Sequence, residues 1–445
     1  MKKRFFLTLL LLVGVVGAKA QKDTTVLELD LKGALEIALS DNPTIKVAGM
    51  EIKRQDYVRR ETRGGLYPQI SASGSYNYNI MNPVMFMPEG LFGPGSGGAM
   101  RMGFSNGIVG GVSVSIPLYM PTIYKMLQLN EKQMMLAVEA ARSTKITLSN
   151  QVKKSYYAVL LGQSSLGVIN KNIETAKVVV TNAQNALSQG VASEYDLITA
   201  QVQLSNLYPV LLTAENGLRV SRLMLNMLLS VALETEVRPT ETLETYASFA
   251  QQDSIYGVDL TGNSDLTTLD IQKEILGKQL KVQQMLRVPT LSAMGQYQVQ
   301  SQNNTLRLGT YDWRGSALAG LQLSIPIFSG LSKLNKERQI KNSISQMAIQ
   351  RDYLEQSVSV EAQAAISSMT SAQGRMKANL EAKTQADKSY KISKTRYDTG
   401  AGTIVEVNSA QAALLQAELN FTQSIFDFMS ARADLDKVVG EYQIQ

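Results

Sequence analysis

The sequence predicts a mainly α-helical protein, built as a tandem repeat, in which each chain contributes four membrane β-barrel strands and long coiled-coil helices. Two stretches that share the sequence Ser-Ile-Pro, at 115–117 and 324–326, set the register between the two halves. Apolar and polar residues alternate before each of these stretches, which is the period of a β-strand. Apolar residues then recur every three or four positions through the long segments that follow, which is the period of a helix.

The first 20 residues are predicted to be a secretory signal peptide that is cleaved after Ala20. A basic start is followed by an apolar run from Phe5 to Val16 and by small residues, and this run is too short to span a membrane. The whole chain has 44 basic and 38 acidic residues, and four of the basic residues lie in the signal. The exported chain is therefore nearly balanced in charge, and we expect no nucleic-acid partner.

The composition argues against enzymatic chemistry. The chain contains no cysteine and no histidine, which excludes thiolate chemistry and removes the commonest general base and metal ligand. Carboxylate, serine and lysine residues show no catalytic constellation at a recognisable spacing. We therefore expect a protein that is not an enzyme and that uses neither a cofactor nor a metal centre. After the signal, no apolar run reaches the length of a membrane helix.

The first repeat, residues 21–233, is predicted to open with two helices followed by two strands. Asn42 and Pro43 are a favourable N-cap and first helical residue for the second of these helices, which Pro68 ends. Strict alternation of apolar and polar residues then predicts two strands, at about 69–80 and 104–118.

The segment between these strands, 81–103, is rich in glycine, proline and methionine and is predicted to be a loop. Two interpretations of its methionines stay open. They could form a soft-metal site built from thioethers, or they could be an ordinary apolar surface loop, which is the commoner role. The residues concerned are Met81, Met85, Met87, Met100 and Met102.

The rest of the chain is predicted to repeat one plan. A long helix from Pro121 reaches a turn at Gly190, and a second helix returns to about Leu229. Residues 234–263 break this pattern and are interpreted as a connector. The second repeat, residues 264–445, then gives a helix, two strands, a long helix, a turn at Gly400 and a returning helix, at about 264–287, 290–300, 313–325, 331–399 and 403–439.

The two returning helices carry apolar residues at a sustained period of 3.5, which indicates a left-handed coiled coil with the preceding long helix. In the first repeat these residues are Leu197, Ala200, Leu204, Leu207, Leu211, Ala214, Leu218, Ser221, Leu225 and Leu228. In the second they are Val407, Ala410, Leu414, Ala417, Phe421, Ser424, Phe428, Ala431, Leu435 and Val438.

Each predicted strand has one apolar face and one face of serine, asparagine, glutamine and glycine. This pattern is typical of a membrane strand with lipid on one side and water on the other, although a soluble sandwich also has two-faced strands. Aromatic residues near the strand ends are predicted to be membrane-interface anchors: Tyr76, Tyr78, Tyr297 and Trp313. Four strands cannot close a conducting barrel, so at least three chains would be needed.

The sequence resembles the family of TolC-type outer-membrane efflux channels. The resemblance covers essentially the whole exported chain and rests on the opening LKGALEIALSDNP, the strand entries LYPQIS and RVPTLS, the paired Ser-Ile-Pro stretches and the two glycine-centred turns. It implies a homotrimer with a twelve-stranded barrel in the outer membrane of a Gram-negative cell. It also implies an α-helical barrel in the periplasm, with the connector in a belt around it.

The resemblance implies that the two turns are periplasmic tips that contact a periplasmic adaptor protein: Gln189, Gly190, Val191, Thr399, Gly400 and Ala401. It further implies a gate in which Tyr397 is hydrogen-bonded to Asp196, with Glu406 in an acidic ring. The family's second acidic position corresponds to Ser409 here, and its gate arginine to Gly402. Independently of any gate, glycine is the usual C-cap of a helix, and an acid in the first turn favours the helix dipole.

The predicted function is that of a passive export duct in a tripartite efflux pump or a type I secretion system. The adaptor and an inner-membrane pump would open the tips, and the remaining partner is outer-membrane lipid. An alternative is a non-conducting envelope scaffold whose coiled-coil tips bind partners. The small polar face shared by all four strands favours the duct.

Overall fold

The computed structural model describes residues 26–87, 98–252 and 259–442, so the predicted signal peptide at 1–20 lies outside the described residues. The chain divides into two compact units. The first, called the tip unit here, comprises Met1–Ala38, Gln151–Asp253 and Ala372–Ser430. The second, called the strand unit, comprises Leu39–Asn150, Ser254–Ser371 and Ala431–Gln445. Each unit therefore draws on both sequence repeats.

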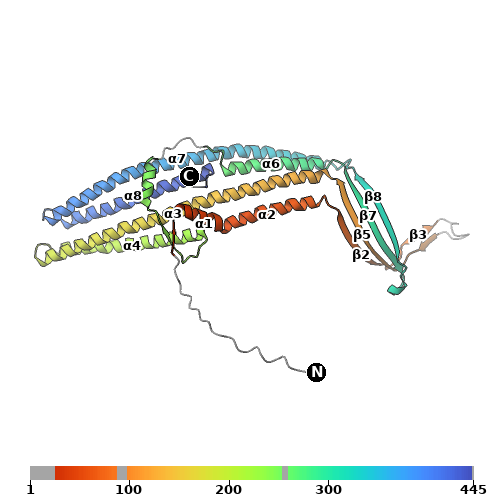
Figure 1. The fold of residues 1–445 in the computed structure, drawn as a ribbon, viewed down its shortest axis with the longest axis horizontal. Coiled ribbons are helices and arrows are strands. Elements are labelled where there is room, and N and C mark those ends of the chain that lie inside the picture. The colour runs from red at the N-terminus through yellow and green to blue at the C-terminus, as the bar shows by residue number, and fades with distance from the viewer. Residues whose placement is uncertain (1–25, 88–97, 253–258, 443–445) are drawn as a thin grey trace, which may run out of the picture. The chain divides into compact units, whose positions relative to one another are not determined.

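The strand unit contains an antiparallel four-stranded sheet in the order β2-β5-β7-β8 (Figure 1). Each strand lies where the alternation predicts one, and β5 of the first repeat pairs with β7 of the second. The strands are β2 (Gln69–Tyr78), β5 (Asn106–Tyr119), β7 (Thr290–Asn303) and β8 (Arg314–Ser324), with a short 3-10 helix, η1 (Leu308–Thr310), between the last two.

The pairing register brings the predicted apolar faces of the four strands together. Ile70 lies opposite Val114, Val112 opposite Tyr297, and Tyr297 opposite Ala317. Because side chains alternate between the faces of a strand, a register shifted by one residue would have mixed apolar and polar positions. The sheet therefore has one continuous apolar face and one largely polar face.

The polar face is held together by side chains that contact one another. The hydroxyl oxygens of Ser71 and Ser113 lie 2.7 Å apart across β2 and β5. Along β7, the Gln296 amide donates to Gln298 at 3.1 Å, and the Gln298 amide donates to Gln300 at 3.4 Å. Burying such groups away from water would be costly, so this face is suited to an aqueous surface.

The segment predicted as a loop at 81–103 contains a small hairpin of β3 (Val84–Met87) and β4 (Gly98–Arg101). The prediction of a loop for this whole segment was therefore wrong. Each strand is only four residues long, and such a short strand is stable only with its partner beside it. The alternation in so short a run was hidden among glycines and prolines.

Long helices continue from the sheet and make up the rest of both units. They are α1 (Leu31–Asp41), α2 (Pro43–Gly64), α3 (Pro121–Ser188), α4 (Glu194–Leu229), α6 (Ser264–Met285), α7 (Ser332–Asp398) and α8 (Ile404–Val439). As the sequence predicts, Asn42 caps α2, and its side-chain oxygen accepts from the Thr44 amide at 2.9 Å. None of the described helices combines the length and apolar character needed to cross a membrane.

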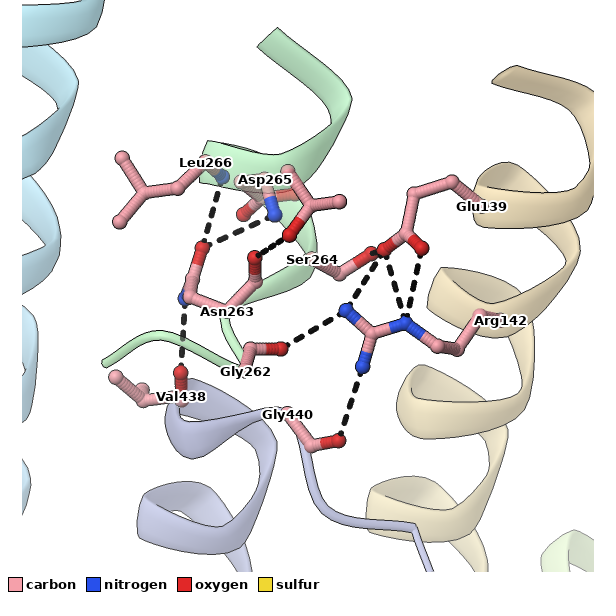
Figure 2. A network of polar contacts seen from close by, with 10 residues as sticks. Glu139, Arg142, Gly262, Asn263, Ser264, Asp265, Leu266, Val438 and Gly440 are labelled. Carbon is pink, nitrogen blue, oxygen red and sulfur yellow. Dashed lines mark hydrogen bonds and ion pairs between the residues drawn. The ribbon is translucent and has the colours of Figure 1, made fainter. Parts of the chain in front are cut away.

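A polar network in the strand unit fixes the start of α6 against α3 and the end of α8 (Figure 2). The Arg142 guanidinium donates to the Gly262 carbonyl at 2.8 Å and to the Gly440 carbonyl at 3.4 Å. Its Nε donates to Glu139, whose carboxylate also accepts from Ser264 at 2.7 Å. The Arg142 side chain thus satisfies two carbonyl groups where the chain reverses direction. Through Glu139, which accepts from Ser264, it also holds the first turn of α6 in place.

Glycine is required at the two reversals that Arg142 joins. A Cβ atom at Gly440, where φ is +86°, would lie 2.0 Å from the Gly262 carbonyl oxygen. A Cβ atom at Gly262 would lie 2.6 Å from the Val439 carbonyl oxygen. Real Cβ atoms do not approach oxygen this closely, so neither position can accept a side chain without backbone movement.

The predicted connector contains two further elements, β6 (Glu236–Pro239) and α5 (Leu243–Gln252), within the tip unit. β6 pairs in parallel with β1 (Val26–Leu29), and Leu27 lies opposite Val237. The two strands are separated by most of the first repeat, which is why local pattern did not reveal them.

A glutamate anchors this part of the tip unit. The Glu241 carboxylate accepts from the hydroxyl of Tyr156 at 3.0 Å and from that of Tyr246 at 2.5 Å. The Tyr157 ring packs edge-on against Tyr246, with centroids 5.2 Å apart. Burial and the nearby Glu241 charge both raise the pKa of the Tyr156 hydroxyl, so this group stays neutral and keeps donating.

Candidate functional site at the tips of the helical hairpins

The two helical hairpins end in turns of the same geometry, both in the tip unit. Gly190 and Gly400 have φ of +73° and +76°, in the left-handed region that glycine adopts without strain. The Gly190 amide donates to the Leu187 carbonyl at 2.9 Å, and the Val191 amide donates to the Ala186 carbonyl at 2.9 Å. This pair of bonds is a Schellman motif.

The second turn repeats this motif. The Gly400 amide donates to the Tyr397 carbonyl at 2.9 Å, and the Ala401 amide donates to the Arg396 carbonyl at 2.7 Å. Like Val191 and Gln189 in the first turn, Thr399 and Ala401 are exposed. The two predicted tips therefore present short, matched and solvent-accessible loops.

The returning helices start in related ways. At the start of α4, Ser193 and Asp196 form a capping box, in which the Ser193 hydroxyl accepts from the Asp196 amide at 3.2 Å. The Asp196 carboxylate in turn accepts from the Ser193 amide at 3.0 Å. At the start of α8, the Thr403 hydroxyl accepts from the Glu406 amide at 3.3 Å. Asp196 and Glu406 thus occupy equivalent positions of the two repeats.

An apolar cluster joins the two hairpins just behind the turns. It combines buried residues of α3, α4 and α8, namely Val179, Ala183, Leu197, Ala200, Ile404 and Val407. Tyr390 and Tyr397 of α7 pack against it. All four helices therefore meet in one apolar cluster near the tips, so a movement of one tip must disturb the other.

The structure brings Asp196 and Tyr397 close together without a hydrogen bond between them. The Asp196 carboxylate is engaged by Ser193, whose hydroxyl donates to it at 2.8 Å. Burial of Tyr397, and then the negative charges of Asp196 and Asp398, raise the pKa of its hydroxyl. The Tyr397 hydroxyl is therefore a neutral donor near an acid. The predicted bond to Asp196 would require a change of side-chain rotamer or an arrangement imposed by a neighbouring chain.

An arginine that the sequence analysis did not single out links the two sides of the second turn. The Arg396 guanidinium donates to the Ala401 carbonyl at 3.1 Å and lies 3.6 Å from the Glu406 carboxylate. A Cβ atom at Gly402 would lie 3.0 Å from the Arg396 Cβ and 3.2 Å from Glu406 Oε2. The small residue at 402 thus leaves room for a cation supplied from the end of α7.

Along its length, α8 buries more residues than those of the predicted stripe. The predicted positions of α4 and α8 are all buried or half-buried. In addition, α8 buries Ile404, Asn408, Gln411, Glu418, Thr422 and Ile425. This second stripe is partly polar, so the hydrophobic pattern of the sequence could not reveal it.

The polar part of this stripe contacts α3 through a buried glutamate. The Glu418 carboxylate accepts from the Asn172 amide at 3.2 Å and lies 3.4 Å from the Lys171 ammonium. The Gln411 amide donates to the Asn172 carbonyl at 3.0 Å. Buried polar contacts between helices favour one register over its neighbours, so this network fixes α8 along α3.

The four predicted interface aromatics lie on or beside the sheet, and each remains about half exposed in the single chain. The Tyr76 hydroxyl donates to the Asn106 side chain at 2.7 Å. The Trp313 ring lies against Tyr311, with centroids 6.2 Å apart. Among the described residues, no group of histidine, cysteine, aspartate and glutamate side chains has the arrangement of a metal site.

The described residues thus form a four-stranded antiparallel sheet and two long helical hairpins. The sequence profile of the family described as outer membrane efflux protein matches residues 34–229 and 259–441. These ranges cover most of the chain, so the protein belongs to this family, and the predicted resemblance is confirmed. The family consists of transport proteins of the outer membrane.

Known relatives agree with this assignment. The chain is 22% identical over 392 residues to the outer membrane protein TolC of Vibrio cholerae, covering 85% of this chain and 83% of the relative. Its fold is similar to that of CusC, with a TM-score of 0.73, 15% identity and 94% coverage of both chains. It is also similar to the CmeC outer membrane channel of Campylobacter jejuni, with a TM-score of 0.70, 14% identity and coverage of 92% and 85%.

Proposed function

We propose that this protein is the passive outer-membrane duct of a tripartite efflux pump or a type I secretion system. The observation that carries the proposal is the register of the sheet, which collects the polar positions of four strands on one face. In a membrane barrel, one face contacts lipid and the other lines the lumen. The serine and glutamine contacts of the polar face suit a lumen filled with water.

The duct would be a homotrimer. In the described part of the chain, the outer edges of β2 and β8 have no partner strand. Unpaired edges are not tolerated in lipid, because their backbone groups have no water to bond to. Joining β2 of one copy to β8 of the next would close a barrel of twelve strands from three chains. Tyr76, Tyr78, Tyr297 and Trp313 would then lie near the membrane interfaces.

The exposed turns would be the periplasmic end of the duct. Their matched loops, including Val191 at 80% exposure, suit contact with a helical hairpin of a periplasmic adaptor. An inner-membrane pump would supply the energy for transport. Asp196, Tyr397 and Glu406 would form the gate, with Arg396 holding the second turn closed against Glu406.

Single-channel conductance in planar lipid bilayers tests this proposal. We expect a small conductance for the wild type and a larger one for the Asp196→Ala/Tyr397→Phe variant, because both groups of the gate contact are removed. Asp196→Ala also removes one of the two reciprocal bonds of the capping box at the start of α4. Ser193→Ala is therefore the matched control, since it weakens the same cap and leaves the Asp196 charge and Tyr397 in place.

The outcomes separate the alternatives. A rise in conductance in the double variant but not in Ser193→Ala supports a gate at these residues. An equal rise in both variants assigns the effect to loosening of the first turn of α4. No conductance from protein that is trimeric and inserted would contradict the duct and favour the non-conducting scaffold.

A further inference from the structure

Basic residues gather where four helices of the strand unit meet the sheet. This place, called the helix–sheet junction here, comprises the sheet-side ends of α2, α3, α6 and α7 and their connections to the strands, residues 57–68, 120–128, 278–289 and 325–339 (Figure 1). Its basic residues are Arg59, Arg60, Arg63, Lys125, Lys278, Lys281, Arg287, Lys333, Lys336 and Arg338. Its acidic residues are Glu61 and Glu337. The junction is therefore strongly positive, although the exported chain as a whole is nearly balanced in charge.

Contacts within the strand unit hold these helix ends together. The Asn130 side chain of α3 donates to the Thr62 hydroxyl of α2 at 2.6 Å. The Lys333 ammonium of α7 donates to the Leu286 carbonyl, directly after α6, at 2.6 Å. Between these two pairs, α3 follows β5 and α6 precedes β7, and these two strands are paired. The basic residues of both repeats therefore lie together at one end of the sheet.

Only part of this positive charge is neutralised within the chain. Asp56 is ion-paired with Arg59 at 2.8 Å and with Arg60 at 2.7 Å. The buried Glu337 is ion-paired with Arg287 at 2.8 Å. In the part of the chain that the structure describes, no acidic side chain pairs with the exposed cations Arg63, Lys281, Lys336 and Arg338. Exposed charges of one sign attract a surface of the opposite sign.

The junction also exposes aromatic side chains beside these cations. Tyr67 is 58% exposed and Phe328 is 81% exposed. The Arg60 guanidinium lies over the exposed Tyr57 ring, 5.7 Å from its centroid. Aromatic rings together with Lys and Arg are typical of the boundary between lipid chains and headgroups, because the rings contact the chains while the cations reach the headgroups. The combination of exposed rings and exposed cations therefore indicates a membrane interface.

We propose that the helix–sheet junction binds the headgroups of anionic phospholipids in the leaflet of the outer membrane that faces the periplasm. This inference rests on the proposed function, which places the sheet in the membrane and the helices in the periplasm. The junction then lies at the level of the headgroups. Their phosphate oxygens accept hydrogen bonds from the Arg63 guanidinium and from the Lys281 and Lys336 ammonium groups.

Helix geometry keeps these three cations close to the membrane. With a rise of about 1.5 Å per residue, Arg63 lies about 2 Å from the sheet-side end of its helix, and Lys281 and Lys336 each lie about 6 Å from theirs. Exposed charges interact over roughly one Debye length, about 8 to 10 Å at physiological salt. Cations farther along the helices are screened from the headgroups: Lys53 of α2 lies about 17 Å and Lys273 of α6 about 18 Å from the same ends.

Quenching of tryptophan fluorescence by brominated lipids tests this inference, because Trp313 is the only tryptophan in the chain. The purified mature protein is inserted into vesicles of phosphatidylethanolamine and phosphatidylglycerol, in which one lipid or the other carries brominated chains. The Trp313→Phe/Tyr67→Trp protein reports on the junction, and the wild type reports on the opposite end of β8. At position 67 we expect phosphatidylglycerol to bind about fivefold more tightly than phosphatidylethanolamine, since one Lys or Arg near an anionic surface contributes about this factor. At Trp313, where Arg314 is paired with Asp312, the ratio should be close to one.

Removing the charges should abolish the preference. In the protein with the probe at position 67, Arg63→Gln/Lys281→Gln/Lys336→Gln should bring the ratio of the two binding constants close to one. The charge-conserving variant Arg63→Lys/Lys281→Arg/Lys336→Arg should keep the ratio of the parent protein, which separates the effect of charge from a change in folding. Added salt should lower the ratio, because it screens exposed charges.

The matched control is Lys46→Gln/Lys53→Gln/Lys273→Gln, which removes the same number of charges farther from the sheet and should keep the preference. The inference is overturned if the two lipids quench the probe at position 67 equally, if Trp313 shows the same preference, or if the control variant loses as much of it as the junction variant. Equal quenching together with a changed reversal potential in the junction variant would assign these cations to the lumen. Absence of quenching by either lipid would instead contradict the proposed function, because the sheet would not be in lipid.

Discussion

Gly162 and Gly167 offer a direct test of the packing between α3 and α4. Both lie inside α3, five positions apart, and both are isolated glycines in a long helix. A Cβ atom at Gly162 would lie 3.0 to 3.2 Å from Cδ1, Cβ and Cα of Leu218 on α4. A Cβ atom at Gly167 would meet nothing within 4 Å. The same substitution, glycine to alanine, therefore creates an unusually tight contact at one site only.

The expected magnitudes follow from two terms. Alanine in place of glycine stabilises a helix interior by about 1 kcal/mol, and this gain is common to both variants. Overpacking a tight interface costs about 1–3 kcal/mol, and this cost applies only to Gly162→Ala, since the backbone of Leu218 must move. Gly167→Ala should thus be more stable than wild type, and the two variants should differ by about 1–3 kcal/mol.

Thermal unfolding followed by circular dichroism at one protein concentration measures this difference. The concentration must be fixed because the stability of an oligomer depends on it. The expected order of midpoints places Gly167→Ala above wild type and Gly162→Ala below Gly167→Ala. If Gly162→Ala is as stable as Gly167→Ala, then α3 and α4 do not approach as closely as the structure shows.

Three other predictions address the polar contacts. Glu418→Leu should lower the free energy of unfolding by about 1–3 kcal/mol, because the buried Asn172 amide and the Lys171 ammonium lose their carboxylate partner. Glu418→Gln should cost less, and denaturant titration distinguishes the two variants. Arg142→Lys should cost about 1–3 kcal/mol, because a lysine cannot donate to two carbonyls and Glu139 at once; equal stability of the variant and wild type would contradict the network of Figure 2. The raised pKa of Tyr397 means that the folded state holds this proton more tightly than the unfolded chain. Its contribution to stability is therefore complete below the ordinary tyrosine pKa, near 10, and falls as the pH rises above it. Raising the pH from 7 to alkaline values should therefore lower the unfolding midpoint of the wild type more than that of Tyr397→Phe. An equal drop in the two proteins would contradict this reasoning.

Much of the fold follows from sequence periodicity, because the long elements repeat one pattern many times. The period of two predicted all four strands of the main sheet, and the period of 3.5 predicted the buried stripes of α4 and α8. Elements that depend on a distant partner were missed, as with β1, which pairs with β6 far along the chain. The second buried stripe of α8 was missed because its polar members, such as Glu418, are buried only when α3 supplies donors.

The candidate site was predictable to a similar extent. The glycines at 190 and 400 marked the turns, because a left-handed C-cap favours glycine. The capping box of Ser193 and Asp196 also has a sequence signal, a serine followed three residues later by an acid, although the capping box was not among the predictions. The position of Arg396 beside Glu406 could not be predicted, since it depends on how the second turn folds back.

The central claim is that three copies of this chain close one barrel through β2 and β8. The absence of native cysteine allows a clean test by cysteine pairs, one on β2 at Ser71, Ser73 or Ser75 and one on β8 at Ser316 or Gln322. The account predicts that at least one pair gives disulfide-linked dimers and trimers on denaturing gels and no larger species, because a closed ring of three has no free edge. Cross-linked ladders that continue beyond the trimer, or no cross-link between chains for any pair, would contradict it.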